Sequence, residues 1–355
     1  MVDRFRIAGA VLRRLDPETA HNLTLWALRH GFAPRDRSPD DPILATRLWG
    51  RALPNPVGLA AGFDKNAVVV GPMLGLGFGF VEVGTITPEP QPGNPAPRVF
   101  RLPEDQAVIN RLGFAGAGMD AAADRLRRWR AACPAGLIGV NLGQDRDAAD
   151  AAADYAAGAR TLAPYADYLV INVSSPNTPG LRALQGRAEL EGLVRRVAAA
   201  LGETGPEGRP PVLVKIAPDL SAADMADIAG IALDRKLGGL IVSNTTLERP
   251  AGLTGRHRTE AGGLSGRPLF ARSTAVMAEM YRLTGGRVPL IGVGGISSGA
   301  DAYAKIRAGA SLVQLYTALV YQGPALVARI KADLAALLRR DGFAAPAEAV
   351  GADHR

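Results

Sequence analysis

The sequence has few of the cysteine, histidine and carboxylate side chains, at the expected strand ends, that most often bind metals. It contains one cysteine, Cys133, which excludes an internal disulfide and makes a thiolate metal cluster implausible. The four histidines are His21, His30, His257 and His354, and none of them stands at the end of an expected strand. Carboxylates are also scarce at those ends. We therefore expect no metal site.

Long apolar runs and basic tracts with interleaved aromatics are also missing. No apolar run approaches the ~20 residues needed to span a bilayer, and residues 1–21 lack the apolar core and cleavage site of a signal peptide. The net charge of +7 permits attraction to anions or anionic lipid. Without a basic and aromatic tract, nucleic-acid binding is not expected. These absences favour a cytosolic protein, free or at a membrane surface.

Two short amphipathic helices are predicted before any strand. Residues 4–15 place apolar side chains on one helical face. Asp16 followed by Pro17 is the pattern of an N-cap and a first helical residue. A helical cap packed on the main domain and a basic, apolar pair in a membrane interface explain the pattern about equally well. We divide the chain into an N-terminal helical segment at residues 1–40, a main domain at 41–342 and a flexible tail at 343–355.

Eight apolar runs alternate with helical patterns after a short hairpin expected in TRLWGRALPNPVGLAAG. The expected strands are residues 57–63, 78–87, 137–143, 168–175, 212–218, 239–246, 289–296 and 312–319. This alternation predicts an α/β protein with a closed (β/α)₈ TIM barrel rather than an open doubly wound sheet. The segment 87–118 is too long for a simple loop, and we expect it over the active-site face. A last helix is expected at residues 324–340.

Polar residues follow nearly every expected strand, at the end where such barrels place their active sites. Asn172 ends the buried run YLVIN, so its amide needs hydrogen-bond partners that a ligand could supply. Lys215 lies inside VLVKIAP, where an ammonium favours an anionic or strongly accepting partner. A turn bonded only to its own backbone and a structural salt bridge are the alternatives for these two residues.

Glycine-containing loops follow the sixth, seventh and eighth expected strands. They are GGLSGRPL around Gly266, IGVGGIS around Gly294 and Gly295, and QLYTAL with Tyr316 and Thr317. Barrels commonly hold a phosphate in that quarter with backbone N–H groups and a helix N-terminus. Three such loops in this order predict a phosphate group. Together with the amides, hydroxyls and buried lysines, they suit a phosphorylated flavin.

At this point the motifs resemble those of a known family. LDPETAH, NPVGLAAGFDKN, VEVGTITPEPQPGNPAPRVFRL, INRLGF, NVSSPNTPGLR, SNTTLER, GGLSGRPL and GVGGIS follow one another as in dihydroorotate dehydrogenase of the membrane-associated, quinone-reducing class. The resemblance covers residues 15–321. It implies oxidation of (S)-dihydroorotate to orotate in pyrimidine biosynthesis, with FMN as hydride acceptor and a quinone as electron acceptor. It also implies a monomer, peripheral on the cytoplasmic side of the cell membrane through its N-terminal helices.

The resemblance implies a role for individual positions. FMN would be held by Ala61, Gly62, Phe63, Asp64, Lys65, Thr85, Asn141, Asn172, Lys215, Ser243, Gly266, Gly295, Tyr316 and Thr317. Orotate would be held by Lys65, Asn110, Arg111, Leu112, Gly113, Phe114, Asn172, Asn177, Asn244 and Thr245, with Lys65 facing its carboxylate. Ser175 would be the catalytic base, with a proton relay through Thr178. Arg101 would contact the quinone head group, or alternatively pair with a nearby carboxylate.

Two other enzyme classes and one binding role stay open. A soluble-class FMN dehydrogenase would use fumarate or NAD, but that class has cysteine where this chain has Ser175. A barrel that binds a phosphorylated metabolite without redox chemistry, such as a lyase or isomerase, would bind no flavin. A membrane-surface binding protein without activity would not need the complete set of strand-end residues.

Overall fold

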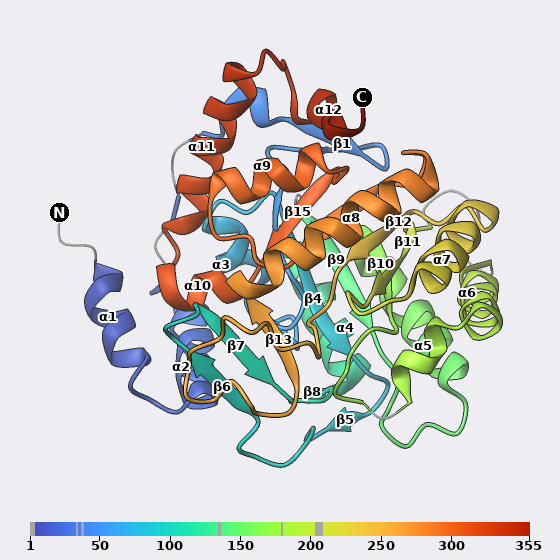
Figure 1. The fold of residues 1–355 in the computed structure, drawn as a ribbon. Helices are drawn as coiled ribbons and strands as arrows, with labels where there is room; N and C mark the ends of the chain where they lie inside the picture. Colours follow the sequence, from blue (N-terminus) through green and yellow to red (C-terminus); the bar gives the residue numbers. More distant parts are fainter. Residues whose placement is uncertain (1–3, 33–34, 37–38, 134–135, 179, 203–208) are drawn as a thin grey trace.

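Eight parallel strands form a closed ring in the computed structural model, which describes residues 4–32, 35–36, 39–133, 136–178, 180–202 and 209–355 (Figure 1). The strands are β3 (Val57–Leu59), β4 (Phe80–Ile86), β9 (Leu137–Leu142), β10 (Tyr168–Asn172), β11 (Val212–Ile216), β12 (Gly239–Val242), β14 (Leu290–Val293) and β15 (Leu312–Leu315). Their order around the barrel is β10, β11, β12, β14, β15, β3, β4, β9. The predicted (β/α)₈ barrel is therefore confirmed.

Each predicted strand overlaps an observed one, but most predicted runs extend beyond the carboxyl end. The run 57–63, for example, contains β3 and then Ala60 and Phe63, which belong to the following loop and are buried. Loops at this end of the barrel are buried because they close over the strand ends. Hydrophobicity alone therefore does not separate the strand from the loop after it.

Helices cover the outside of the barrel (Figure 1). They are α3 (Val70–Gly75), α4 (Gly118–Ala132), α5 (Ala151–Leu162), α6 (Arg187–Gly202), α7 (Ala222–Asp234), α8 (Phe270–Thr284), α9 (Gly299–Arg307), α10 (Thr317–Gln322) and α11 (Leu326–Arg340). Several begin at a side-chain cap. Ser221, for example, forms a capping box with Asp224 at the start of α7.

The excursion between β4 and α4 is structured and lies over the carboxyl ends of the strands. Its strands are β5 (Pro90–Gln91), β6 (Val99–Leu102), β7 (Ala107–Asn110) and β8 (Gly116–Ala117). The strand β13 (Gly263–Gly266), which follows β12 in the chain, joins β7 and β6 in an antiparallel sheet. β5 pairs with β8. The expectation that this segment is more than a loop is confirmed.

The N-terminal segment consists of α1 (Arg4–Leu12) and α2 (Pro17–Arg29), and α1 stands at the edge of the molecule (Figure 1). Asp16 caps α2 as predicted, accepting the N–H of Thr19 at 2.9 Å. The linker after α2 is fixed to α11, because Lys331 Nζ lies 2.8 Å from Asp36 and 2.6 Å from Asp40. Among the described residues, no helix has the length and apolar character needed to cross a membrane.

Residues 343–355, expected as a flexible tail, are folded against the barrel helices. They form α12 (Pro346–Ala349) and a short 3₁₀ turn, Ala352–His354. The His354 ring stacks on Tyr281 of α8 with centroids 4.9 Å apart, and Arg307 of α9 bonds Asp353 at 2.7 Å. The alanine-rich composition of this segment gave no sign of these partners, because they come from other helices.

The interior of the barrel is filled by large side chains that depend on glycines opposite them. Tyr168 and Phe80 are fully buried in this inner cluster. A Cβ on Gly139 of β9 would lie 2.0 Å from Cζ of Tyr168, and one on Gly58 of β3 would lie 2.3 Å from Cζ of Phe80. The two aromatic rings thus occupy the space that side chains at these strand positions would need.

We predict that Gly139→Ala lowers the stability of the fold by about 3 kcal/mol, because overpacking against a fully buried ring forces the strands apart. Thermal and denaturant unfolding would measure the loss. Gly192→Ala is the matched control, since an added Cβ there meets nothing within 4 Å inside α6. That change should raise stability by about 0.5–1 kcal/mol. Equal midpoints for Gly139→Ala and the wild type would contradict the packing argument.

Candidate functional site

A single cavity of about 1120 Å³ opens at the carboxyl ends of the barrel strands. Its walls come from the strand-end loops, from β6 and β7 of the excursion, and from β13. It continues to the two N-terminal helices, where Leu12, Arg13, His21 and Leu25 line it. The polar end in the barrel and the apolar end at α1 and α2 therefore belong to one continuous space.

Most of the predicted site residues line this cavity. They are Ala61, Gly62, Phe63, Asp64, Lys65, Thr85, Arg101, Asn110, Leu112, Gly113, Phe114, Asn172, Ser175, Asn177, Lys215, Ser243, Asn244, Thr245, Gly266, Gly295, Tyr316 and Thr317. Three predicted residues do not line it, namely Asn141, Arg111 and Thr178. Each of the three has a different surrounding.

Asn141 lies behind the cavity wall and orients the residues in front of it. Its Nδ2 donates to Glu82 Oε1 at 2.8 Å, so its Oδ1 faces Asn172 and Thr85. Asn172 Nδ2 donates to Asn141 Oδ1 at 3.0 Å and to Thr85 Oγ1 at 2.9 Å. The direction of the first bond thus fixes the Asn172 amide, whose Oδ1 is left for donors on the other side. Asn141 is a support for the site rather than part of its wall.

Glu82 is a fully buried carboxylate that the sequence analysis missed. Besides Asn141, it accepts Tyr168 Oη at 3.0 Å and Gln314 Nε2 at 2.7 Å, so one group connects four barrel strands. These donors are neutral. Burial lowers the pKa of Lys215 across the barrel, and the charge of Glu82 opposes that lowering. The signal was present in the sequence. Glu82 interrupts the apolar run FVEVG in the same way that Lys215 interrupts VLVKI.

Two lysine ammonium groups face the cavity without a salt bridge to any described residue. Burial lowers the pKa of Lys215, and Glu82 offsets part of that effect. Burial likewise lowers the pKa of Lys65 to about 8, with Glu18 as the main opposing charge. The structural salt bridge considered for Lys215 is not present as a direct contact. Both ammonium groups are therefore available to an anionic or accepting ligand.

Asp64 also lines the cavity, but its carboxylate binds backbone N–H groups of the protein and is not available to a ligand. Its carboxylate accepts the N–H groups of Val68 at 2.9 Å and Val69 at 2.7 Å, and burial raises its pKa. It therefore shapes the loop that presents Lys65.

The described residues hold no group of three or more His, Cys, Asp or Glu that could bind a metal ion.

Ser175 lies among amides at the end of β10. Its Oγ accepts the N–H of Asn177 at 3.3 Å, and Asn177 Nδ2 donates to Asn110 Oδ1 at 3.2 Å. Thr178 lines a neighbouring cavity of about 560 Å³, which shares Asn177 and Phe114 with the main cavity. No hydrogen bond between the side chains of Ser175 and Thr178 is present among the described residues.

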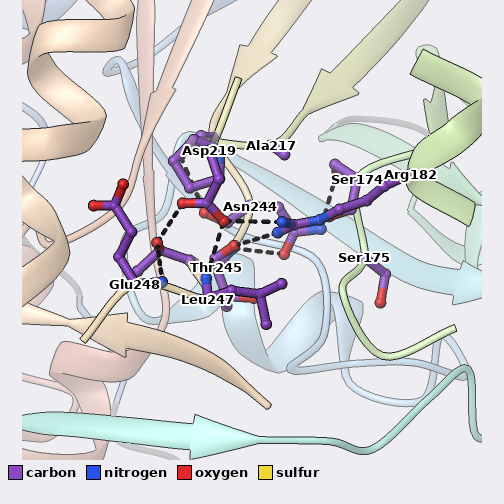
Figure 2. Close-up of polar contacts among 12 residues, drawn as sticks. Ser174, Ser175, Arg182, Ala217, Asp219, Asn244, Thr245, Leu247 and Glu248 are labelled. Atoms are coloured by element: carbon purple, nitrogen blue, oxygen red, sulfur yellow. Dashed lines mark hydrogen bonds and ion pairs between the residues drawn. The ribbon is translucent and has the colours of Figure 1, made fainter. Parts of the chain in front are cut away.

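Arg182 holds together the loops around Ser175 (Figure 2). Its guanidinium donates to Ser174 O at 3.2 Å and to Thr245 O at 3.0 Å, and it pairs with Asp219 at 2.9 Å. Asp219 in turn accepts the N–H of Leu247 at 2.9 Å. Figure 2 shows the Ser175 side chain pointing away from this network. The loops after β10, β11 and β12 are thus fixed from behind while Ser175 stays free on the cavity side.

The glycine loops have the backbone geometry that a phosphate cradle needs. Gly266 has φ +96°, and a Cβ there would lie 2.4 Å from Gln106 O. Gly295 has φ +78°, and a Cβ there would lie 2.5 Å from Cα of Phe270. Only glycine fits either position. Thr317 lies beside them, at the start of α10, and bonds Ser265 at 2.9 Å.

Two further polar atoms in the cavity wall lack a partner among the described residues. They are Thr245 Oγ1 and Gln314 Oε1, both buried. Buried polar atoms are normally hydrogen-bonded, so each is a position where a ligand or water would be bound. The donor set as a whole therefore suits a planar ligand rich in carbonyl and N–H groups.

Arg111 departs from the prediction because its side chain turns out of the cavity. Its Nη1 pairs with Glu260 at 2.9 Å, and the guanidinium lies 4.5 Å from the centroid of the Phe100 ring. Its neighbours Asn110 and Leu112 line the cavity. Four of the five predicted residues from Asn110 to Phe114 therefore line the cavity, and the ion pair with Glu260 turns the Arg111 side chain away.

Arg101 lies where the cavity reaches the N-terminal helices. Its Nη1 donates to the backbone carbonyl of Leu15 at 2.8 Å and to that of Arg13 at 3.2 Å. Burial lowers its pKa, whereas Asp16 acts on it only at longer range. The carboxylate pairing considered in the sequence analysis is thus replaced by bonds to the turn between α1 and α2.

His21 of α2 was missed, because LDPETAH was interpreted only as the start of a helix. The ring lines the cavity and contacts Phe63 edge-on, with centroids 5.3 Å apart, and lies 6.5 Å from Tyr316. Burial lowers the pKa of His21 to about 4, and the charge of Lys65 acts in the same direction. His21 is therefore neutral at physiological pH.

Comparison with known proteins gives one consistent family. The family described as dihydroorotate dehydrogenase matches residues 43–338. A Rhodospirillum rubrum protein named dihydroorotate dehydrogenase (quinone) is 60% identical over 355 residues, covering 100% of this chain and 96% of that protein. The mitochondrial protein of the same name from Mus musculus is 54% identical, covering 98% and 89%. The crystal structure of DHODH from Eimeria tenella in complex with ferulenol has a TM-score of 0.94 at 43% identity, covering 97% and 99%.

We predict that His21 makes the fold less stable in mild acid. Its pKa of about 4 in the folded chain lies below the usual 6.5, so the unfolded chain binds the proton more tightly and stability falls as the pH drops below about 6.5. Between pH 7 and pH 5 the loss from this group is on the order of 2 kcal/mol. Denaturant unfolding of His21→Gln should show a pH dependence reduced by that amount.

His30→Gln is the control for the loss of an imidazole, since His30 is the exposed C-cap residue of α2. Its unfolding is measured at the same two pH values. If His21→Gln and the wild type lost the same stability between the two pH values, a buried neutral His21 would be excluded.

Proposed function

The chain belongs to the dihydroorotate dehydrogenase family, and we infer that it oxidises dihydroorotate to orotate with a quinone as electron acceptor, a step of pyrimidine biosynthesis. Its full-length relatives from a bacterium and from a mitochondrion carry the quinone-dependent name at 60% and 54% identity. The structural observation that supports this activity most directly is the continuous cavity. It joins a polar pocket at the barrel strands to an apolar space at α1 and α2.

We propose that the flavin of this family is bound here as FMN. The residues fit both parts of the molecule: the Gly266 and Gly295 backbone suits the phosphate, and the unpaired Lys215 with the Thr245 and Gln314 oxygens suits a ring with carbonyl and N–H groups. Bound FMN supplies a ring that accepts a hydride and passes electrons onward. The chain itself supplies the orientation, because Asn172 and Thr85 both donate hydrogen bonds to Asn141 Oδ1.

Dihydroorotate is proposed to lie against Asn110, Asn172, Asn177 and Asn244, with its carboxylate on Lys65. Amide groups can both donate and accept, which matches the imide edge of the substrate. Ser175 Oγ is proposed to take the proton from C5 while its own hydroxyl proton leaves through a relay that involves Thr178 and a water. A serine hydroxyl is a weak base, so the site has to support it. The Asn177 N–H orients Ser175 Oγ, and Lys65 is proposed to stabilise negative charge that develops on the substrate.

The quinone is proposed to enter between α1 and α2 and to meet Arg101 with its head group. The space there is lined mainly by apolar side chains, including Leu12, Leu25 and Leu28. Arg101 bonds the α1 to α2 turn, so it connects the quinone entrance to β6 of the excursion. His21 and Tyr316 are neutral at physiological pH and lie between the two ends of the cavity.

Membrane contact is proposed through the same helices, as a peripheral monomer on the cytoplasmic side. Six large apolar side chains in the described chain are exposed, and five of them belong to the N-terminal segment: Val11, Leu15, Leu23, Trp26 and Phe32. Arg13, Arg14 and Arg29 flank them. Exposed apolar side chains beside basic ones are typical of helices that lie in a membrane interface.

We predict that Ser175→Ala keeps the flavin but reduces it at least about 100-fold more slowly with dihydroorotate, because the proton acceptor is lost. Anaerobic stopped-flow measurement of flavin bleaching would give the rate. Ser221→Ala, at the cap of α7 and away from the cavity, should bleach at the wild-type rate. Bleaching of Ser175→Ala at a near wild-type rate would remove Ser175 from the role of base.

We also predict that the double change Trp26→Ser, Phe32→Ser lowers affinity for anionic vesicles at least about tenfold, because two exposed aromatic anchors are lost. Vesicle co-sedimentation measures this affinity. Leu247→Ser is the matched control, because Leu247 is the sixth exposed apolar side chain and lies outside the N-terminal segment. Equal losses in the two variants would mean that α2 is only a structural cap.

A further inference from the structure

Lys305 of α9 is a fully buried lysine with no part in the cavity wall. Its Nζ donates to Ser273 Oγ at 2.6 Å and lies 5.3 Å from the centroid of the Phe270 ring. No carboxylate in the described part of the chain forms an ion pair with it. A methionine would fill similar space without the cost of burying a charge. A buried ammonium group at this position therefore indicates a role beyond packing.

Ser273 links this ammonium to the glycine loop. Its hydroxyl oxygen accepts from Lys305, and its one hydrogen is within reach of Gly294 O at 3.0 Å and Phe270 O at 3.1 Å. Phe270 O already accepts the hydroxyl of Thr274 at 2.7 Å, so we assign the Ser273 hydroxyl hydrogen to Gly294 O. The contact is close, because a Cβ on Gly294 would lie 2.8 Å from Ser273 Oγ.

The Gly294 and Gly295 backbone lines the cavity in the quarter where the three glycine loops meet. We propose that Lys305 is a positioning residue for the phosphate of the flavin: through Ser273 it fixes the Gly294 peptide, and its positive charge lies two hydrogen bonds behind the loop. This inference rests on the proposed binding of FMN. It extends the phosphate subsite from the glycine backbone to a buried cation that the ligand does not touch.

The charge balance around Lys305 supports this role. Burial lowers the pKa of Lys305 to about 7, and Asp301 on the same helix opposes that effect only in part. The charged form of Lys305 is therefore only weakly favoured without a ligand, and no carboxylate among the described residues is paired with it. A doubly charged phosphate on the other side of the Gly294 peptide provides the missing negative charge, and in a medium of low polarity this attraction is strong at short range.

The test compares two ligands that differ only in the phosphate. Dissociation constants of FMN and riboflavin are measured by flavin fluorescence quenching on the full chain freed of its flavin, for the wild type and for Lys305→Met. FMN should bind about tenfold or more weakly to the variant, because the cation behind the phosphate is gone. Riboflavin should bind within about twofold of the wild type, because it has no phosphate to be held.

Two further variants separate the charge from the hydrogen bond. Lys305→Gln keeps an N–H donor but no charge, so its FMN affinity should fall as in Lys305→Met. Ser273→Ala keeps the charge and loses the link, so its loss should be smaller. These variants also carry the test if Lys305→Met does not fold. Lys331→Met is the matched control, since Lys331 is a buried lysine of α11 that is paired with Asp36 and Asp40. It should leave the ratio of the two affinities unchanged.

If the Lys305 variants bound FMN and riboflavin with equally reduced affinity, Lys305 would only support the fold. If their affinity for FMN were unchanged, the charge of Lys305 would have no effect on phosphate binding. Either result overturns the inference while leaving the proposed function intact. A wild-type chain that binds neither ligand would instead overturn the proposed function. The two failures are therefore distinguishable by the wild-type measurement alone.

Discussion

The closed ring of parallel strands is the constraint on which the site depends. Because all eight strands run the same way, their carboxyl ends meet on one side, and residues far apart in the chain come within hydrogen-bond distance there. Glu82 links four of the eight strands through hydrogen bonds in the barrel interior. It accepts bonds from β9, β10 and β15, so one buried carboxylate sets both the packing of the strands and the direction of the Asn141 amide in front of them.

Buried charge recurs through the molecule, and it is rarely paired directly. Glu82, Lys215 and Lys305 are all buried without an ion pair to another described residue. Such groups weaken a fold unless something compensates them. Of the two lysines, Lys215 lines the cavity where the flavin ring is proposed to lie, and Lys305 lies behind the loop proposed to hold the phosphate. The barrel is thus preorganised for ligands whose charged or polar groups compensate these buried charges, at the expense of its own stability.

Two kinds of support lie behind the cavity wall. The Arg182 and Asp219 pair fixes the loops after β10, β11 and β12 from outside, and leaves Ser175 on the inner side (Figure 2). The Ser273 and Lys305 pair fixes the glycine loop after β14. Arg182 bonds backbone carbonyls directly, whereas Lys305 acts on the Gly294 carbonyl through the Ser273 hydroxyl. Rigid loops of this kind let small side chains such as serine and asparagine hold a precise geometry.

The sequence by itself determined the barrel, its eight strands and the polar residues at the strand ends, because apolar periodicity and polar strand ends are local properties of the chain; the cavity residues of the excursion, such as Asn110 and Arg101, came from the family resemblance. The tertiary structure decided the rest. It turned Arg111 outward to Glu260, placed Asn141 behind the wall and Thr178 beside it, and folded residues 343–355 onto Tyr281. Each of these outcomes depends on a partner from a distant segment, and local sequence contains no information on which partner the fold brings near.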